Sequence, residues 1–301
     1  MIRRLAAFAL CLSAPLSAAG APVAPQILTE DVDRFFRLYD DAGGHPTAEQ
    51  LDSDYLAPGT AGLHEIAKLR SVTGARIAAN IAAHLEVYAK ARTCLSVLPA
   101  VKLRLASAFA RLSALYPEAK NPPVTFVIGR GRPVGITDSS GVTMGLEALC
   151  SADFMDPNVE DRFVHTIAHE YGHIQQSPAQ QALEPDTPQA TVLTMSLMEG
   201  AGEFTAELIS GGVGNYQHAV WIETAFLRDA DKTDLSAWMY NGVGDAAQPG
   251  DLGYWVGYRI IKAYYLRAHD KQQALREIYA MPDPKAFLAK SGWKPGMTIP
   301  G

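Results

Sequence analysis

The sequence predicts a predominantly helical α+β fold with a small β-sheet and an N-terminal helical region. Apolar residues recur at helical spacing between residues 32 and 116, a short alternating β-branched segment follows, and helical spacing then returns. The chain has 301 residues, of which 48% are hydrophobic and 19% charged. This composition can form a real core, in one compact domain or in two lobes.

The first residues are typical of a secretory signal. Arg3 and Arg4 precede an apolar stretch from Leu5 to Leu16, and small residues follow it. We place cleavage after Ala19, so residues 1–19 are the predicted signal peptide, and we expect a periplasmic or secreted protein. Beyond the signal we find no run of roughly 18 apolar residues, so we expect no stable membrane span.

Helical periodicity dominates the next part of the chain, and the turn at residues 121–123 (Asn-Pro-Pro) ends it. We therefore predict an N-terminal helical region over residues 20–120 and a core over residues 121–301. The periodic apolar positions are Phe35, Leu38 and Tyr39, then Ile77, Ile81, Leu85 and Tyr88, and then Leu105, Phe109, Leu112 and Leu115.

Two short strands are expected after this turn. Val124, Phe126 and Ile128 alternate as in a strand, a glycine-rich loop follows, and residues 142–146 read as a second strand. The loop lacks the spacings GxxxxGK[ST] and GxGxxG that bind phosphates. The second strand is either an edge to which an extended peptide adds or a buried inner strand, and the sequence leaves both open.

Charge and cysteine content limit the partners and the compartment. The chain carries 26 basic and 32 acidic side chains, a net charge of −6 without a basic stripe, so no nucleic-acid partner is expected. After removal of the signal, Cys94 and Cys150 are the remaining cysteines. An oxidising compartment would let them pair, and two buried thiols are the alternative.

The motif HEYGH lies on an amphipathic helix that we expect to begin at Asp156-Pro157. Four residues advance a helix by about 400°, so His169 and His173 project side by side and can hold one ion. Glu170 lies one step round the helix, close enough to reach a metal-bound water without being a ligand. Random placement gives only about 0.01 such motifs in a chain of this composition.

A second helix is predicted from Thr191 to Ser210. A catalytic zinc site takes three protein ligands, and this helix offers carboxylates at four-residue spacing. Gly200 and Gly202 interrupt it at a cost of about 1 kcal/mol each, which a close approach to another helix would explain. These carboxylates are Glu199, Glu203 and Glu207, and a solvated acidic stripe is the alternative reading of them.

These motifs resemble a known group. HEYGH, followed by EGAGEF, looks like the gluzincin clan of zinc metallopeptidases. More narrowly, the segments VTFVIG, VTMGLE, TIAHEYGHIQQ, MEGAGEF and GYWVGYRI resemble a bacterial family of exported proteins regarded as zinc-dependent proteases. The likeness covers roughly residues 120–292. It implies a zincin-like metalloprotease core over residues 121–301, one Zn²⁺ per chain and a peptide or protein substrate.

The resemblance also implies roles for single residues. His169, His173 and Glu199 would be the metal ligands, and Glu170 the general base that takes a proton from a zinc-activated water. Glu203 would correspond to the acidic residue that bonds a ligand histidine. Glu203 as the third ligand is the main alternative, because one helical turn separates it from Glu199 by only about 6 Å.

A second donor to the developing oxyanion is expected from downstream, as in gluzincins. Tyr258 is the predicted residue, and Tyr254 and His218 are the alternatives. A core position for the two tyrosines, which follow helical aromatic spacing, stays open. His165, one turn before His169, is expected to be structural or to support the ligands.

The sequence thus predicts an exported zinc metalloprotease, a hydrolase of peptide bonds. A zinc aminopeptidase is the alternative within enzymes, although the sequence marks no acidic residue to hold the substrate amine. A non-catalytic metal-binding or partner-binding protein that retains the fold is the alternative outside them. Glu170 separates these classes, because a structural zinc site has no use for a base and prefers four ligands, usually with cysteine.

Overall fold

The computed structural model describes residues 25–132, 134–138, 140–152, 155–212, 220–242, 244 and 250–300. Its architecture is mostly helical, with one small sheet and an N-terminal helical region, as predicted. The predicted signal peptide (residues 1–19) and His218 lie outside the described residues. The division of the chain at residues 120 and 121 stays a prediction.

The elements fall in the following order. The helices described are α1 (Glu30–Asp41), α2 (Ala48–Gln50), α3 (Ala61–Leu69), α4 (Gly74–Ala83), α5 (Leu85–Cys94), α6 (Leu98–Leu115), α7 (Leu146–Ser151), α8 (Val159–Gln175), α9 (Pro178–Gln181), α10 (Val192–Ser210), α11 (Val220–Asp229), α12 (Leu252–Arg267), α13 (Lys271–Ala280) and α14 (Pro284–Ser291). A π-helical turn, η1 (Leu51–Leu56), and a 3₁₀ turn, η2 (Leu95–Val97), lie among them. The strands described are β1 (Ile27–Leu28), β2 (Val124–Val127), β3 (Gly135–Asp138) and β4 (Gly141–Gly145).

The sheet has the strand order β1-β2-β4-β3. β2 runs parallel to β1 and to β4, whereas β3 pairs antiparallel with β4. The strand predicted over residues 142–146 is therefore the inner strand β4, which is buried along its whole length. Because β4 has partners on both sides, no peptide can add to it. Among the described strands, the open edge on this side of the sheet belongs to β3.

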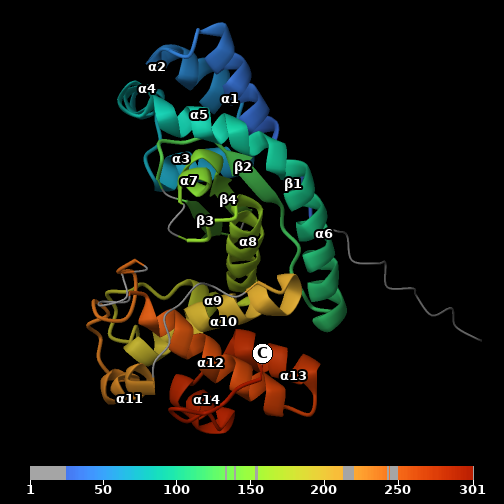
Figure 1. Ribbon diagram of the computed structural model, residues 1–301, viewed down its shortest axis with the longest axis vertical. Helices are drawn as coiled ribbons and strands as arrows, with labels where there is room; N and C mark the ends of the chain where they lie inside the picture. The colour runs from blue at the N-terminus through green and yellow to red at the C-terminus, as the bar shows by residue number, and fades with distance from the viewer. Residues whose placement is uncertain are drawn as a thin grey trace, which may run out of the picture.

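Two apolar clusters form the core. The first joins the N-terminal helices to the sheet and to α8. The second is built mainly from α10 to α14 and the segment between α11 and α12. Figure 1 shows α1 to α5 at one end of the molecule, α8 in the middle and α12 to α14 at the other end. Helices α8 and α10 pack against each other where the two clusters meet.

Helix α8, which carries HEYGH, begins later than the sequence suggested. The expected cap at Asp156-Pro157 is wrong, because the Asn158 side chain accepts a hydrogen bond from the backbone N–H of Asp161 and caps the helix instead. Asp156 supports this cap by accepting a bond from the backbone N–H of Asn158. The register of the two histidines on the helix is unaffected.

Helix α10 confirms the predicted reason for its glycines. A Cβ added to Gly200 would lie 2.1 Å from the carbonyl carbon of Gly257 in α12. A Cβ added to Gly202 would lie 2.9 Å from the ring of His169 in α8, and one added to Gly172 would lie 2.9 Å from the Cα of Gly202. Non-bonded carbons ordinarily stay about 3.5–4.0 Å apart, so only glycine permits these approaches.

One helical stretch among the described residues, Leu85–Leu115, is long and apolar enough by length and composition to cross a membrane, with a mean hydropathy of 1.3 over its best window. The apolar content of the sequence did not predict it. It is weak evidence for a span, because core helices of soluble proteins have the same length and composition.

A disulfide joins Cys94 at the end of α5 to Cys150 in α7, which confirms the expected pairing. The bond closes a loop with a sequence separation of 56 residues. It ties the N-terminal helices directly to the segment between the sheet and α8.

We predict that replacing both cysteines, Cys94→Ala with Cys150→Ala, lowers the free energy of unfolding by about 4 kcal/mol, because the unfolded chain regains the entropy of an open loop. Urea unfolding of the variant and of the oxidised wild type measures the difference. An unchanged midpoint and slope would contradict the prediction.

Candidate metal centre

Three donor atoms from two helices converge at the junction of the clusters. His169 and His173 extend from α8, and Glu199 from α10. The two Nε2 atoms are 3.0 Å apart, and each lies 3.2 Å from Oε2 of Glu199. Ligands of a tetrahedral ion at about 2.0–2.1 Å would be about 3.3 Å from one another. The donor set therefore fits a single zinc ion, and it forms a group that could hold a metal.

The partners of the outer ring nitrogens, Nδ1, show why Nε2 is the nitrogen of each histidine that can bind a metal. Nδ1 of His173 lies 3.1 Å from Oε1 of Gln176, and Nδ1 of His169 lies 2.8 Å from Oε1 of Glu203. Both oxygens favour a proton on Nδ1, which leaves each Nε2 with a lone pair. Two such lone pairs and the Glu199 carboxylate repel one another unless a cation or a proton lies among them.

Burial and neighbouring charges shift the pKa values of the buried histidine and glutamates in opposite directions. Burial lowers the pKa of His169, but the carboxylates of Glu199 and Glu203 outweigh it and raise that pKa well above its usual value. Burial likewise raises the pKa of Glu199 and of Glu203, and the neighbouring histidines more than reverse it, so both pKa values lie well below the usual range. Two ionised carboxylates in a buried site need positive charge beside them.

Glu203 lies behind the donor group rather than in it. Its Oε1 contacts Nδ1 of His169, and its Oε2 lies 3.2 Å from Nε2 of His165. The carboxylate thus bridges two histidines of α8 from one turn further along α10. This geometry gives no support to Glu203 as the third ligand, and it places His165 in contact with Glu203 rather than with the donors.

Glu170 has a partner that the sequence did not predict. Its Oε2 accepts a hydrogen bond from the hydroxyl of Thr137 on β3, the edge strand. No sequence motif predicts this role for Thr137, because the hydrogen bond to Glu170 depends on how β3 packs against α8. The bond fixes the direction of the Glu170 carboxylate.

The predicted oxyanion donor, Tyr258, lies in a different network. It is buried, and its hydroxyl accepts a hydrogen bond at 3.0 Å from Nζ of Lys262, which also pairs with Glu207 at 2.7 Å. Burial, followed by the charge of Glu207, raises the pKa of Tyr258 well above its usual value. Among the described residues, no contact between Tyr258 and the donor group supports the predicted role.

Tyr254, the alternative to Tyr258, has a contact with the donor group. Its ring stacks on the ring of His169, with centroids 6.1 Å apart and planes inclined by 23°. This ring contact supports Tyr254 as a residue of the site. It involves the aromatic ring and not the hydroxyl that an oxyanion donor would use.

Tyr240 was not expected from the sequence. Its hydroxyl donates a hydrogen bond of 3.1 Å to Oε1 of Glu199, the oxygen that faces away from the histidines. Partial burial and the adjacent Glu199 raise the pKa of Tyr240 well above its usual value, so the hydroxyl keeps its proton. Tyr240 follows α11 in a segment without periodicity or a known motif, and no sequence signal pointed to it.

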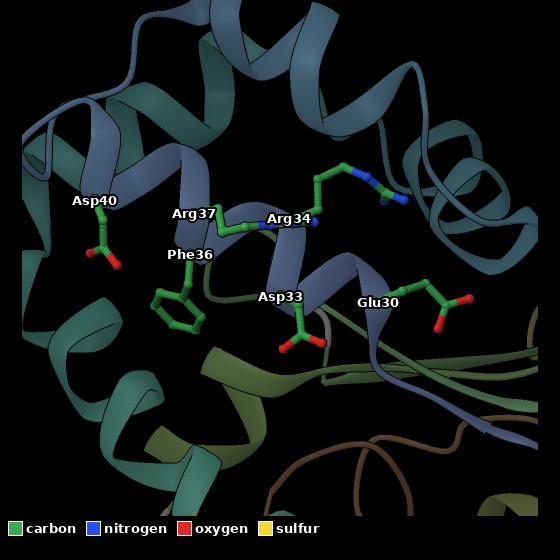
Figure 2. A pocket seen from close by; sticks show the side chains of 6 residues that line it. All are labelled: Glu30, Asp33, Arg34, Phe36, Arg37 and Asp40. Atoms are coloured by element: carbon green, nitrogen blue, oxygen red, sulfur yellow. The ribbon is translucent and has the colours of Figure 1, made fainter.

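The described residues also form a hollow away from the donor group. A hollow of about 380 Å³ lies along α1, and Figure 2 shows Phe36 and the charged side chains that line it. The acids and bases there are mixed, and Asp40 pairs with Arg92. Exposed pairs of this kind are typical of a solvated helix face.

Comparison with known families supports the metal site. Residues 149–283 match the model of a family described as "Predicted Zn-dependent protease (DUF2268)". The match covers less than half of the chain, from within α7 to the residue before α14, and it includes both helices of the donor group. Comparison with curated proteins and with solved structures gave no match.

We predict that Gly202→Ala weakens zinc binding at least about ten-fold, because the added methyl group would displace the His169 ring. Competition with a chromogenic chelator measures the affinity. Gly212→Ala is the matched control, since its Cβ would meet His165 at an ordinary 3.5 Å. Equal affinity in both variants would contradict the packing argument.

Glu199→Ala should lose zinc more severely than Glu203→Ala. The first variant removes a donor atom, whereas the second removes a contact to Nδ1 of His169, which typically costs 10–100-fold in affinity. The same titration ranks the two variants, and the reverse order would assign the third ligand to Glu203.

Proposed function

We propose that the chain is an exported zinc metalloprotease that hydrolyses peptide bonds in a peptide or protein substrate. The observation that carries the proposal is the donor triad of His169, His173 and Glu199 with the carboxylate of Glu170 next to it in sequence. The match to a family of predicted Zn-dependent proteases supports it independently of the geometry.

A zinc ion bound by these donors would supply a Lewis acid that lowers the pKa of water toward about 7 and polarises a carbonyl group. The chain supplies the remaining functions. Glu203 favours the proton on Nδ1 of His169 and so keeps Nε2 available as a ligand. Glu170, oriented by Thr137, accepts the proton of the attacking water and returns it to the leaving amine.

The edge strand β3 suits an extended substrate. A peptide that adds to β3 by main-chain hydrogen bonds would run along the strand that carries Thr137, and therefore past Glu170. Residues 142–146 were one candidate for the strand to which a peptide adds. Because they form the inner strand β4, we propose β3 for this role instead.

Export is supported by the chemistry of the cysteines. A disulfide between Cys94 and Cys150 persists in an oxidising compartment and is rare in the cytosol. Together with the secretory pattern of residues 1–19, it favours the periplasm or the extracellular space.

Glu170→Gln tests the proposal most simply. The variant should retain about one zinc per chain, because Glu170 is not a donor, and should lose peptide cleavage by at least about a hundred-fold, because a carboxamide cannot accept the proton. Metal analysis and terminal profiling of a proteome digest measure the two properties.

Glu184→Gln is the matched control, since this exposed carboxylate lies in the loop after α9. It should keep both the metal and the cleavage. Cleavage that survives in Glu170→Gln would overturn the assigned base. Zinc binding without cleavage in the wild type would favour the non-catalytic alternative.

A further inference from the structure

We propose that Tyr240 is a positioning residue that holds the outer oxygen of Glu199, so that this carboxylate presents a single oxygen to the metal. The inference rests on the proposed function, since it assumes that the donor triad binds zinc. It assigns to Tyr240 a role in metal affinity and coordination number rather than in the chemical step.

The two oxygens of Glu199 have separate partners. Oε2 lies 3.2 Å from Nε2 of His169 and of His173, while Oε1 accepts the hydroxyl proton of Tyr240 at 3.1 Å. A carboxylate can bind a metal through one oxygen or through both, and a hydrogen bond to one oxygen favours the single contact. A single contact keeps three protein donors and leaves the fourth position to water, as catalytic zinc requires.

The backbone holds Tyr240 in an unusual conformation. Its φ of +58° lies in the left-handed region, which bulky residues rarely adopt. The next residue, Asn241, exchanges two hydrogen bonds with Asp251, whose own φ is +46°. Strained residues persist where the surroundings fix them, and they cluster at functional sites. The reciprocal Asn241–Asp251 pair is the structural reason that Tyr240 stays directed at Glu199.

Aromatic packing connects Tyr240 to the other helix of the site. Its ring is perpendicular to the ring of Tyr254, with a centroid distance of 6.3 Å and an angle of 89° between the planes. Tyr254 in turn stacks on His169. Tyr240 thus contacts the ligand Glu199 directly and is connected to the ligand His169 through the ring of Tyr254. Half of the surface of Tyr240 is exposed.

Tyr240→Phe removes the hydroxyl and keeps the ring. We expect zinc to bind about ten-fold more weakly, as is typical when a partner of a ligand is removed. In the Co²⁺-substituted protein, the visible absorption bands should weaken, because a carboxylate that binds through both oxygens raises the coordination number. The unfolding temperature of the metal-free protein should not change.

Tyr264→Phe is the matched control, since its hydroxyl bonds Glu277, outside the donor group. Wild-type affinity and an unchanged Co²⁺ spectrum in Tyr240→Phe would overturn the inference and leave the proposed function standing. A fall in the unfolding temperature of the metal-free variant, in proportion to the loss of affinity, would also overturn it, because the role would then be structural. A wild-type chain that binds no zinc would refute the proposed function itself.

Discussion

The close approach of α8 to α10 is the constraint on which the rest of the site depends. Gly172 and Gly202 let the two backbones meet without an intervening side chain. That contact brings imidazoles of one helix and carboxylates of the other into a shared buried space. Carboxylates removed from water must have positive charge beside them, so the packing itself creates the demand for a cation. Fold and chemistry are linked through this one helix crossing.

The sequence predicted the part of the site that depends on helical period alone. The spacing of His169 and His173 fixes a shared direction in any helix, and the fold class followed from similar periodic patterns. The choice between Glu199 and Glu203 could not be made in this way. Both lie on the same face of α10, and the level at which α8 crosses that helix decides which of them meets Nε2 and which meets Nδ1.

Other features depend on long-range packing and gave no signal in the sequence. Thr137 reaches Glu170 because β3 lies at the sheet edge against α8, and Tyr240 reaches Glu199 because its segment is pinned to the start of α12. Tyr258 shows the opposite case. Helical aromatic spacing allowed either a core or a site position, and the structure joins its hydroxyl to Lys262, which pairs with Glu207 of α10.

X-ray absorption at the zinc edge, on purified protein loaded with one equivalent of zinc, tests the central claim most directly. The account predicts only nitrogen and oxygen neighbours at about 2.0–2.1 Å, with the outer scattering of two imidazole rings. Sulfur neighbours at about 2.3 Å, or a spectrum without imidazole scattering, would contradict it, because the metal would then be held by residues other than those of the α8 and α10 crossing.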